Sequence, residues 1–475
     1  MKQIDILPDD VLLEIFDFYV ITDSLHELED IPPGEIKRAI EAWQLLVHVC
    51  RRWRSLVLGS PRRLNLRLFC TSKTPIRDTL DVWPALPLVV DSGGFMGFSS
   101  DTDNIIAALG HNNRICQVDL YFWDLEEVLA AMQVPFPELT DLQITCTSVG
   151  AEPVIPDSFL DGSAPRLQFL ELRGIPFPGL PKLLSTTTNL VELELTDIPH
   201  SWYISPEAMV ALLSSLSVLR IFSLEFKSRQ SRPASGWGWE SRSLPLPKQS
   251  VLPALRRVDF RGLIEYLEDL VTRIDTPQLD QMDIHFFNQI DFDFPQLAQF
   301  INRSPTLRAR DEAHVQFNYY IASVALLAQS SQRTLKIGFP RREPDRQLSS
   351  VARVCNSPLH PFSTVEDLYI EHRDRLLVWK NDTTENTLRL QLLLPFTAVK
   401  NLYLSEEFAP SIAAALQELD GGRITEVLPS LQNIFVEGLG SLGTFRANIE
   451  QFVTARQLSD HPIAISKWRK DSYMK

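Results

Sequence analysis

The sequence predicts an α/β protein in which an N-terminal helical module precedes a solenoid of stacked strand–helix repeats. Three observations lead to this prediction. One short apolar pattern recurs from about residue 114 onward, most stretches between its copies have helical periodicity, and the first 68 residues contain apolar helices instead. At 475 residues the chain is too long for one ordinary core, which favours several domains or one long repeat array.

The recurring pattern is an apolar residue, two variable residues, an apolar residue, one variable residue and a third apolar residue. Its last three positions alternate as in a strand, and neighbouring copies are mostly 23 to 36 residues apart. One strand–helix unit cannot bury its apolar face alone, whereas stacked neighbours bury it together. The copies are Ile115/Val118/Leu120, Leu139/Leu142/Ile144, Leu167/Leu170/Leu172, Leu190/Leu193/Leu195, Leu219/Phe222/Leu224, Leu255/Val258/Phe260, Leu279/Met282/Ile284, Val365/Leu368/Ile370, Val399/Leu402/Leu404 and Leu431/Ile434/Val436.

Helices are expected between many of these strands, at residues 125–132, 205–216, 263–274 and 297–301. A strand, a helix and a parallel strand form a right-handed unit. Pattern and helices together resemble an irregular leucine-rich repeat, although the asparagine position of that repeat is mostly absent. A doubly wound sheet would also alternate strands and helices, but with fewer strands and stronger valine and isoleucine runs.

The rhythm of the repeats also predicts the domain boundaries. We expect the helical module at residues 1–68, a linker with a first, capping unit at 69–113, the solenoid at 114–458 and a C-terminal tail at 459–475. Two stretches break the rhythm, near residues 227–250, which are rich in Ser, Arg, Pro, Gly and Trp, and near 339–363, which are rich in proline. Both are interpreted as loops inserted into the solenoid.

The N-terminal module begins with a helix over residues 7–20. Pro8 suits a first helical turn because its missing N–H would have no partner there, and Asp9 and Asp10 favour the positive end of the helix dipole. A second helix is expected from about Glu35 to Leu58, and it has nearly two apolar stripes where a surface helix needs one. The second stripe must contact either the following domain or a partner protein.

The module resembles an F-box, of the expanded family found in filamentous and mushroom-forming fungi. The resemblance rests on residues 7–16, LPDDVLLEIF, and residues 47–54, VHVCRRWR, and it covers about 55 of the 475 residues. It implies a three-helix fold that docks the Skp-type adaptor of a cullin–RING ubiquitin ligase. The implied adaptor-facing residues are Leu7, Pro8, Val11, Ile15, Phe16, Val47, Cys50 and Trp53, some of which must instead form the module core.

Composition argues against several other functions. A net charge of −14 disfavours nucleic acid as a partner. The five cysteines are far apart and no pair has CxxC spacing, so neither a zinc site nor a disulfide framework is expected. Acidic residues near the N-terminus replace the apolar run of a signal peptide, and no stretch approaches the roughly 18 apolar residues of a membrane span. We expect a cytoplasmic or nuclear protein without a membrane partner.

Catalytic motifs are missing as well. The sequence lacks the P-loop pattern, the G-x-S-x-G nucleophile elbow and the H-E-x-x-H zinc motif. We therefore expect no catalytic residues, no metal and no cofactor. The interpretation is a substrate receptor of a ubiquitin ligase, in which the helical module docks the adaptor and the solenoid binds an unknown protein target. Two alternatives remain open: the helices only cap a solenoid scaffold, or an F-box protein acts outside any ligase.

The strand register predicts the target-binding face. Successive side chains of a strand point to opposite sides, so the residues between the apolar positions should lie on the concave surface. Aromatic residues and arginine are enriched in protein interfaces, and an acidic bias in the N-terminal half of these positions predicts a target with lysine or arginine. The candidate target-binding residues are Phe169, Glu171, Arg173, Glu194, Arg257, Asp259, Tyr369, Tyr403 and Phe435.

Overall fold

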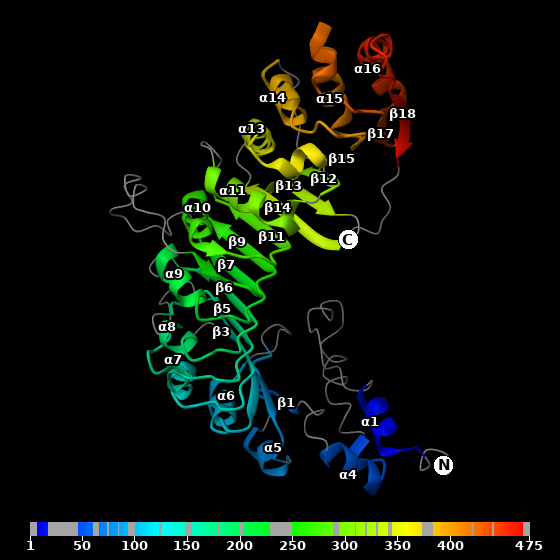
Figure 1. Ribbon diagram of the computed structural model, residues 1–475. Coiled ribbons are helices and arrows are strands. Elements are labelled where there is room, and N and C mark those ends of the chain that lie inside the picture. Colours follow the sequence, from blue (N-terminus) through cyan, green and yellow to red (C-terminus); the bar gives the residue numbers. More distant parts are fainter. Residues whose placement is uncertain are drawn as a thin grey trace. The chain divides into compact units, whose positions relative to one another are not determined.

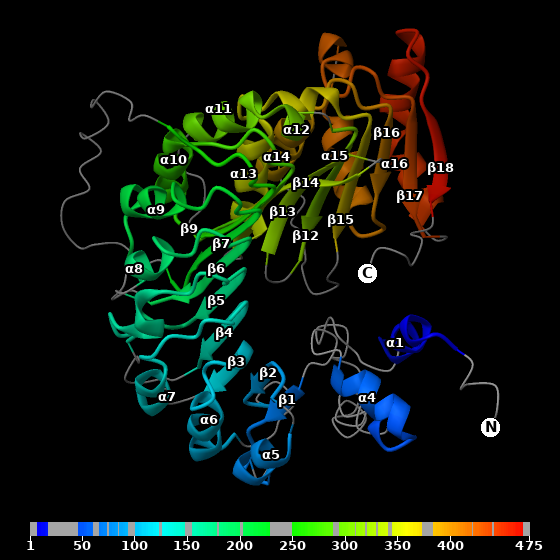
Figure 2. The ribbon, with the colours of Figure 1, turned by 60° about the horizontal axis from the view of Figure 1, so that its bottom comes forward.

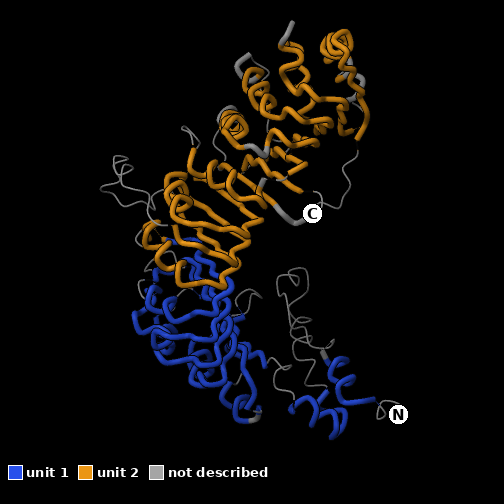
Figure 3. Tube along the Cα trace, viewed as in Figure 1, with its two compact units in different colours: residues 1–198 blue, residues 199–475 orange. Residues whose placement is uncertain are grey.

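The computed structural model describes most of the chain, in two compact units that comprise residues 1–198 and 199–475 (Figure 3). Each unit is considered by itself. The described residues are 7–17, 46–59, 66–73, 76–83, 85–93, 100–122, 126–147, 154–177, 180–199, 203–228, 249–287, 294–308, 310–318, 321–328, 331–340, 344–372, 383–419, 421–438 and 441–468. The predicted loop at 227–250 falls almost entirely outside them.

Unit 1 contains a parallel sheet whose strands follow one another in chain order (Figure 1). Helices cover one face of this sheet, and the other face is called the open face of unit 1. The strands are β1 (Leu66–Phe69), β2 (Leu88–Asp91), β3 (Ile115–Phe122), β4 (Asp141–Cys146), β5 (Phe169–Arg173) and β6 (Glu192–Ile198). The covering elements are α5 (Ile76–Val82), α6 (Thr102–Leu109), α7 (Glu126–Ala131), η5 (Phe159–Gly162) and α8 (Leu180–Leu184).

The predicted strand register is confirmed in unit 1. Leu170 pairs with Leu193 and Leu172 with Leu195 across β5 and β6, and all four side chains are buried. The residues between them lie on the open face. The apolar positions form a continuous buried row because parallel strands bring equivalent positions of successive repeats side by side.

Unit 2 continues the same strand–helix alternation. Its sheet has the order β7-β9-β11-β14-β13-β12-β15-β16-β17-β18. The strands are β7 (Ile221–Phe226), β9 (Arg257–Gly262), β11 (Gln281–Phe286), β12 (Glu312–Phe317), β13 (Ile321–Ala328), β14 (Ser331–Pro340), β15 (Asp367–His372), β16 (Asn401–Leu404), β17 (Asn433–Glu437) and β18 (Ala464–Trp468). A separate short parallel pair joins β8 (Ser250–Val251) to β10 (Ile274–Asp275).

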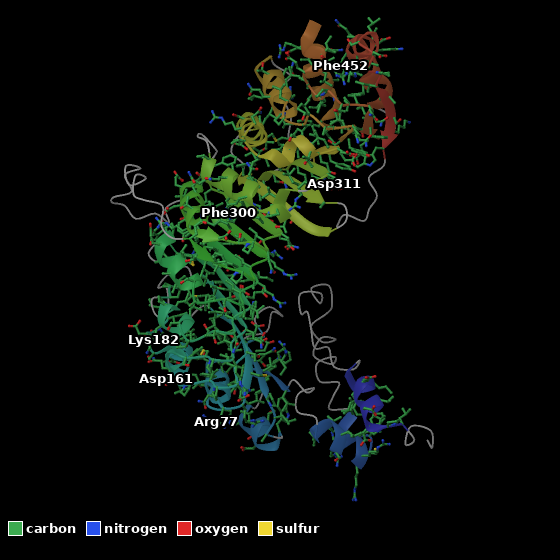
Figure 4. All side chains as sticks on the ribbon, viewed as in Figure 1. Arg77, Asp161, Lys182, Phe300, Asp311 and Phe452 are labelled. Atoms are coloured by element: carbon green, nitrogen blue, oxygen red, sulfur yellow. The ribbon has the colours of Figure 1, made fainter. Side chains whose placement is uncertain are left out.

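Helices cover one face of the sheet of unit 2 and leave the other as its open face (Figures 1 and 2). Phe300 of α11 lies on the helical side (Figure 4) and is fully buried. The helical elements are α9 (Pro206–Leu213), α10 (Ile264–Arg273), α11 (Pro295–Arg303), α12 (Pro305–Arg308), α13 (Pro344–Cys355), η8 (His360–Thr364), α14 (Thr383–Leu393), α15 (Ala409–Gln417), η9 (Gly421–Thr425) and α16 (Ser441–Leu458).

Cap residues explain where several of these helices begin. The Ser205 side chain accepts a hydrogen bond from the backbone N–H of Ala208 at the start of α9, where Pro206 occupies the first turn. The N-terminal end of α11 is capped instead by a side chain of the neighbouring helix α10. The buried carboxylate of Glu268 on α10 accepts hydrogen bonds from the N–H groups of Gln296 and Leu297, at 3.1 and 2.7 Å. This contact fixes α11 beside α10.

The gap in the repeat pattern between residues 284 and 365 has a structural cause. Strands β12, β13 and β14 form an antiparallel meander, in which only β13 runs against the other strands of the sheet. β14 pairs in parallel with β11, and β12 pairs in parallel with β15. The meander therefore joins the sheet without a helix between its strands, which is why the strand–helix rhythm disappears from the sequence there.

Three predicted boundaries are wrong. The loop expected near 339–363 instead holds the end of β14, helix α13 and η8. Leu348, Val351, Ala352 and Cys355 of α13 are buried at helical spacing, a pattern masked by the prolines around it. The segment 69–113, expected to hold a linker and a first capping unit, does contain a strand–helix unit with α5, β2 and α6, but the sheet already begins at Leu66, inside the segment assigned to the helical module. The tail expected at 459–475 contains β18, which pairs with β17 because Ile465 continues the row of Ile434.

Candidate binding surfaces

An aromatic row crosses the open face of unit 2. His314, Tyr369, Tyr403 and Phe435 occupy equivalent positions on β12, β15, β16 and β17. Their ring centroids lie 4.3, 4.2 and 4.7 Å apart in that order, and the planes of neighbouring rings are within 12° of parallel. The parallel register produces this stack, because strands about 4.8 Å apart set equivalent side chains at ring-stacking distance. We call these four side chains the aromatic ladder.

Trp468 joins the ladder from the last described strand. Its ring centroid lies 5.8 Å from that of Tyr369 and 5.5 Å from that of Tyr403, at interplanar angles of 58° and 64°. His314 is buried, whereas both tyrosines, Phe435 and Trp468 are half-buried. The ladder is therefore anchored at the His314 end and reaches solvent through its other members.

The electrostatic surroundings of the ladder are acidic. Burial raises the pKa of Tyr369 above its usual range, and the neighbouring Tyr403 and the carboxylates of Glu312 and Asp367 raise it further. Burial and the same two carboxylates also raise the pKa of Tyr403. Both hydroxyls therefore stay protonated at neutral pH.

Polar pairs continue this surface beside the ladder. The Asn401 amide donates to the carboxylate of Asp367 at 2.7 Å, and Asn433 donates to Asn401 at 2.8 Å. On the other side of the ladder Gln316 donates to Glu371 at 3.5 Å. These bonds run from strand to strand and hold the open-face side chains in a fixed order.

A second row of polar residues lies on the open face of unit 1. Asp91, Asp119, Gln143, Glu171 and Glu194 occupy equivalent positions on β2 to β6. Asp91 binds Arg67 at 2.7 Å, and Glu171 lies 3.7 Å from Arg173. Burial, Asp91 and Glu171 raise the pKa of Asp119 to about 7, while Arg67 opposes the shift. This row is acidic and closely packed.

The predicted target-binding residues do not form one site. Phe169, Glu171, Arg173 and Glu194 belong to unit 1, whereas Arg257, Asp259, Tyr369, Tyr403 and Phe435 belong to unit 2. Glu171 was expected to be exposed, but it is only 8% exposed because neighbouring strands crowd it. Arg257 binds Asp259 at 2.8 Å on β9, away from the ladder in the strand order. The structure brings together Glu171, Arg173 and Glu194 in unit 1, Arg257 and Asp259 on β9, and Tyr369, Tyr403 and Phe435 in the ladder.

Two members of this surface were missed from the sequence. His314 lies in the antiparallel meander, where the repeat pattern is lost, and Trp468 lies in the segment taken for a tail. A signal existed for the second, because Ile463 and Ile465 alternate with Ala464 and Ser466 as in a strand, which places Trp468 on the face opposite the isoleucines.

The N-terminal helices contact each other. The rings of Phe16 on α1 (Asp9–Asp17) and Trp53 on α4 (Arg51–Gly59) lie 4.7 Å apart. Arg52 reaches back to the Asp9 carboxylate and the Leu7 carbonyl, each at 2.5 Å. These contacts join the two halves of the predicted F-box pattern. Residues 18–45 lie outside the described part of the chain, so the three-helix module stays a prediction.

The predicted adaptor-facing residues divide between core and surface. Phe16 is buried in the helix pair, which places it in the core rather than on a docking face. Ile15 and Pro8 are exposed. The remaining five, Leu7, Val11, Val47, Cys50 and Trp53, are half-buried. Val49, which was not among the predicted residues, is 58% exposed in the turn before α4 and adds to the apolar surface there.

The described residues contain no group of three His, Cys, Asp or Glu side chains placed to hold a metal ion. The five cysteines form no disulfides. No described helix combines the length and the apolar character that crossing a membrane requires.

Each unit builds a sheet with one helix-covered face and one open face from successive strand–helix units, a mixed α/β fold that resembles a leucine-rich-repeat solenoid. No protein-family model matches the sequence, and no curated protein matches it. Among solved structures, the leucine-rich repeat-containing protein LegL7 from Legionella pneumophila is similar at 13% identity, with a TM-score of 0.28, over 83% of this chain and 98% of that one. At this TM-score the likeness supports no further conclusion.

Proposed function

We propose that this chain is a protein-interaction receptor that binds its target on the open face of unit 2. The aromatic ladder is the observation that supports the proposal best. Interface hot spots are enriched in tyrosine and tryptophan, which supply large contact areas at a low entropic cost. Here three half-buried aromatic side chains, of Tyr369, Tyr403 and Trp468, adjoin on one surface and are held by their own stacking.

Preorganisation is the physical advantage of this arrangement. Immobilising one flexible side chain on binding costs about 0.5–1.5 kcal/mol. The ladder rings are already fixed by neighbours at 4.2 to 4.7 Å, so a target that contacts them meets side chains that have little freedom left to lose.

Target capture tests this proposal. Tagged full-length protein and the double variant Tyr369→Ala/Tyr403→Ala would be purified from cells, and the recovered proteins compared by quantitative mass spectrometry. We expect a defined set of proteins to be lost from the double variant. Tyr121→Ala on the open face of unit 1 is the matched control and should retain them. If charge reversal in residues 227–250 abolishes capture and the double variant does not, the target binds the loop instead.

The second part of the proposal is that the N-terminal helix pair docks a Skp-type adaptor and, through it, a cullin. The supporting observations are the contact between α1 and α4 and the apolar side chains left exposed on the pair and in the turn before α4, among them Ile15 and Val49. The chain would then serve as the non-catalytic substrate receptor of a ubiquitin ligase in the cytoplasm or nucleus. Its contribution to the reaction would be proximity, by holding the target near the charged ubiquitin.

Adaptor binding is tested with the variant Pro8→Ala/Ile15→Asp. A charge placed in a desolvated apolar contact costs several kcal/mol, so pull-down of purified adaptor should fall sharply while circular dichroism stays unchanged. Val134→Asp introduces the same charge at an exposed valine outside the helix pair and serves as the control. Unchanged adaptor binding by Pro8→Ala/Ile15→Asp would leave the helix pair as a cap of the solenoid. Adaptor binding without any change in target abundance after deletion of the gene would favour a role outside a ligase.

A further inference from the structure

Trp468 contacts the edges of the ladder tyrosines, not their faces. Tyr369 has His314 stacked on one side and Tyr403 on the other, and Tyr403 lies between Tyr369 and Phe435. No ring face of either tyrosine is left for a further aromatic partner. The inclined Trp468 ring therefore receives the tyrosine edges, a favourable edge-to-face contact. The indole itself is half-buried and provides aromatic surface at the open side of the cluster.

Carboxylates surround this aromatic surface. Glu437 is the strand partner of Trp468 across β17 and β18 and is half-buried beside it. Glu371 of β15 is buried and accepts a hydrogen bond from Gln316, whereas Glu312 and Asp367 are half-buried on the other side of the ladder. Among the open-face positions of β12, β15, β16 and β17, there are four acidic residues and neither lysine nor arginine.

Two basic residues elsewhere on the open face of unit 2 are paired with acids, and a third, Arg261 on β9, lies over the ring of Phe287. Lys336 on β14 lies 3.1 Å from the carboxylate of Asp283, and Arg257 binds Asp259 on β9. These pairs reduce the charge at the β9 to β14 end of the sheet. Along β7, β9, β11 and β14 the open-face acids and bases are equal in number, so the net negative formal charge of the described open-face strands lies on β12, β15 and β17.

We propose that this acidic aromatic surface binds an arginine side chain of the target protein. The inference rests on the proposed function and specifies the chemistry of the target. A planar guanidinium can stack on the indole of Trp468 while its N–H groups donate to the half-buried carboxylate of Glu437. A lysine ammonium is a compact, strongly hydrated charge that cannot stack and bond in a plane at once. Anionic segments are repelled, and the covered tyrosine faces leave little open ring surface for a sugar.

Three synthetic peptides would test the proposal by calorimetry with the full-length protein. They share the capped sequence (X-Ser)₃, in which X is arginine, lysine or citrulline. Citrulline keeps the planar shape of arginine but carries no charge, and lysine keeps the charge without the plane. We expect the arginine peptide to bind about tenfold more tightly than the lysine peptide, and the citrulline peptide not to bind measurably.

Two variants and one control assign the binding to this surface. Trp468→Ala removes the stacking surface, and Glu437→Gln removes one charge with little change of shape. Each should weaken binding of the arginine peptide about tenfold. Glu450→Gln removes the same charge from an exposed position on α16 and should change the affinity less than about twofold. Circular dichroism would reveal whether Trp468→Ala perturbs β18. In that case the Glu437→Gln variant still tests whether the arginine peptide binds this surface.

Equal affinities for the arginine and lysine peptides would overturn the proposal. So would equal losses in Glu437→Gln and Glu450→Gln, since these would show attraction to the net negative chain rather than to a site. Failure of this inference is distinct from failure of the proposed function. If the peptides do not bind but target capture still requires Tyr369 and Tyr403, the open face is a receptor surface for a target without arginine.

Discussion

Tyr369 and Tyr403 stack face to face across β15 and β16, with ring centroids 4.2 Å apart and planes within 7° of parallel. They are directly paired in the parallel register, two positions along from the pair of Asp367 with Asn401. The spacing of the strands therefore sets the spacing of the rings. The same register extends the stack to His314 and Phe435, so one backbone regularity produces the whole ladder.

A double-mutant cycle should measure this stacking directly. Tyr369→Leu and Tyr403→Leu keep apolar bulk but remove the rings, and aromatic pairs contribute about 0.5–1.5 kcal/mol beyond buried area. We expect a coupling energy of that size in chemical unfolding. The pair Tyr403→Leu and Leu193→Ala involves distant positions and should be additive within about 0.5 kcal/mol. A zero coupling between the tyrosines would contradict the ladder.

Leu193→Ala should destabilise the protein by about 2–5 kcal/mol, because it opens a cavity between stacked strands. Leu193 is fully buried and pairs with Leu170. Val134→Ala is a suitable control, since Val134 is 42% exposed and surface truncations change stability by about 0.5 kcal/mol or less. A change of less than about 0.5 kcal/mol for Leu193→Ala in reversible unfolding would mean that the strand register is wrong.

Glu268→Ala should destabilise unit 2 by about 1–3 kcal/mol, the cost of leaving buried hydrogen-bonding groups without partners. The carboxylate accepts the N–H groups of Gln296 and Leu297 at the start of α11. Hydrogen exchange of these two amides should accelerate in the variant while the amides of α16 stay protected. Glu450→Ala, at an exposed position on α16, should leave the exchange rates of all these amides unchanged. Equal exchange in wild type and Glu268→Ala would show that the cap is dispensable.

Stability of unit 1 should depend on pH through Asp119. Its folded pKa is raised to about 7 from an ordinary value of 3.8, so folding favours the protonated acid. The stabilisation is fully present below the unfolded pKa and is lost as the pH rises through about 7. Asp119→Asn mimics the neutral form and should be more stable than wild type at pH 8, with a smaller difference at pH 5.

The urea midpoints of both proteins, measured between pH 5 and pH 8, check this expectation. Asp157→Asn removes an exposed carboxylate of the same unit and should preserve the wild-type pH dependence. If Asp119→Asn had the same pH slope as wild type, another group would be responsible.

The sequence by itself determined the repeat architecture and its register. The apolar row from Ile115 to Val436 and the helices between 205 and 216 and between 263 and 274 could be predicted, because burial of one strand face imposes a periodic pattern on the chain. The same alternation predicted that Tyr369, Tyr403 and Phe435 share one face. Each of these conclusions depends only on local spacing.

Tertiary structure alone decided which of those side chains meet. Strand order placed the antiparallel meander between β11 and β15, which brought His314 against Tyr369, and pairing with β17 turned residues 464–468 into a strand that delivers Trp468 to the ladder. It also buried Glu171 and separated Phe169 from Tyr369 into different units. Spacing along a chain reports which face a residue occupies, whereas its neighbours on that face depend on pairings between segments far apart in sequence.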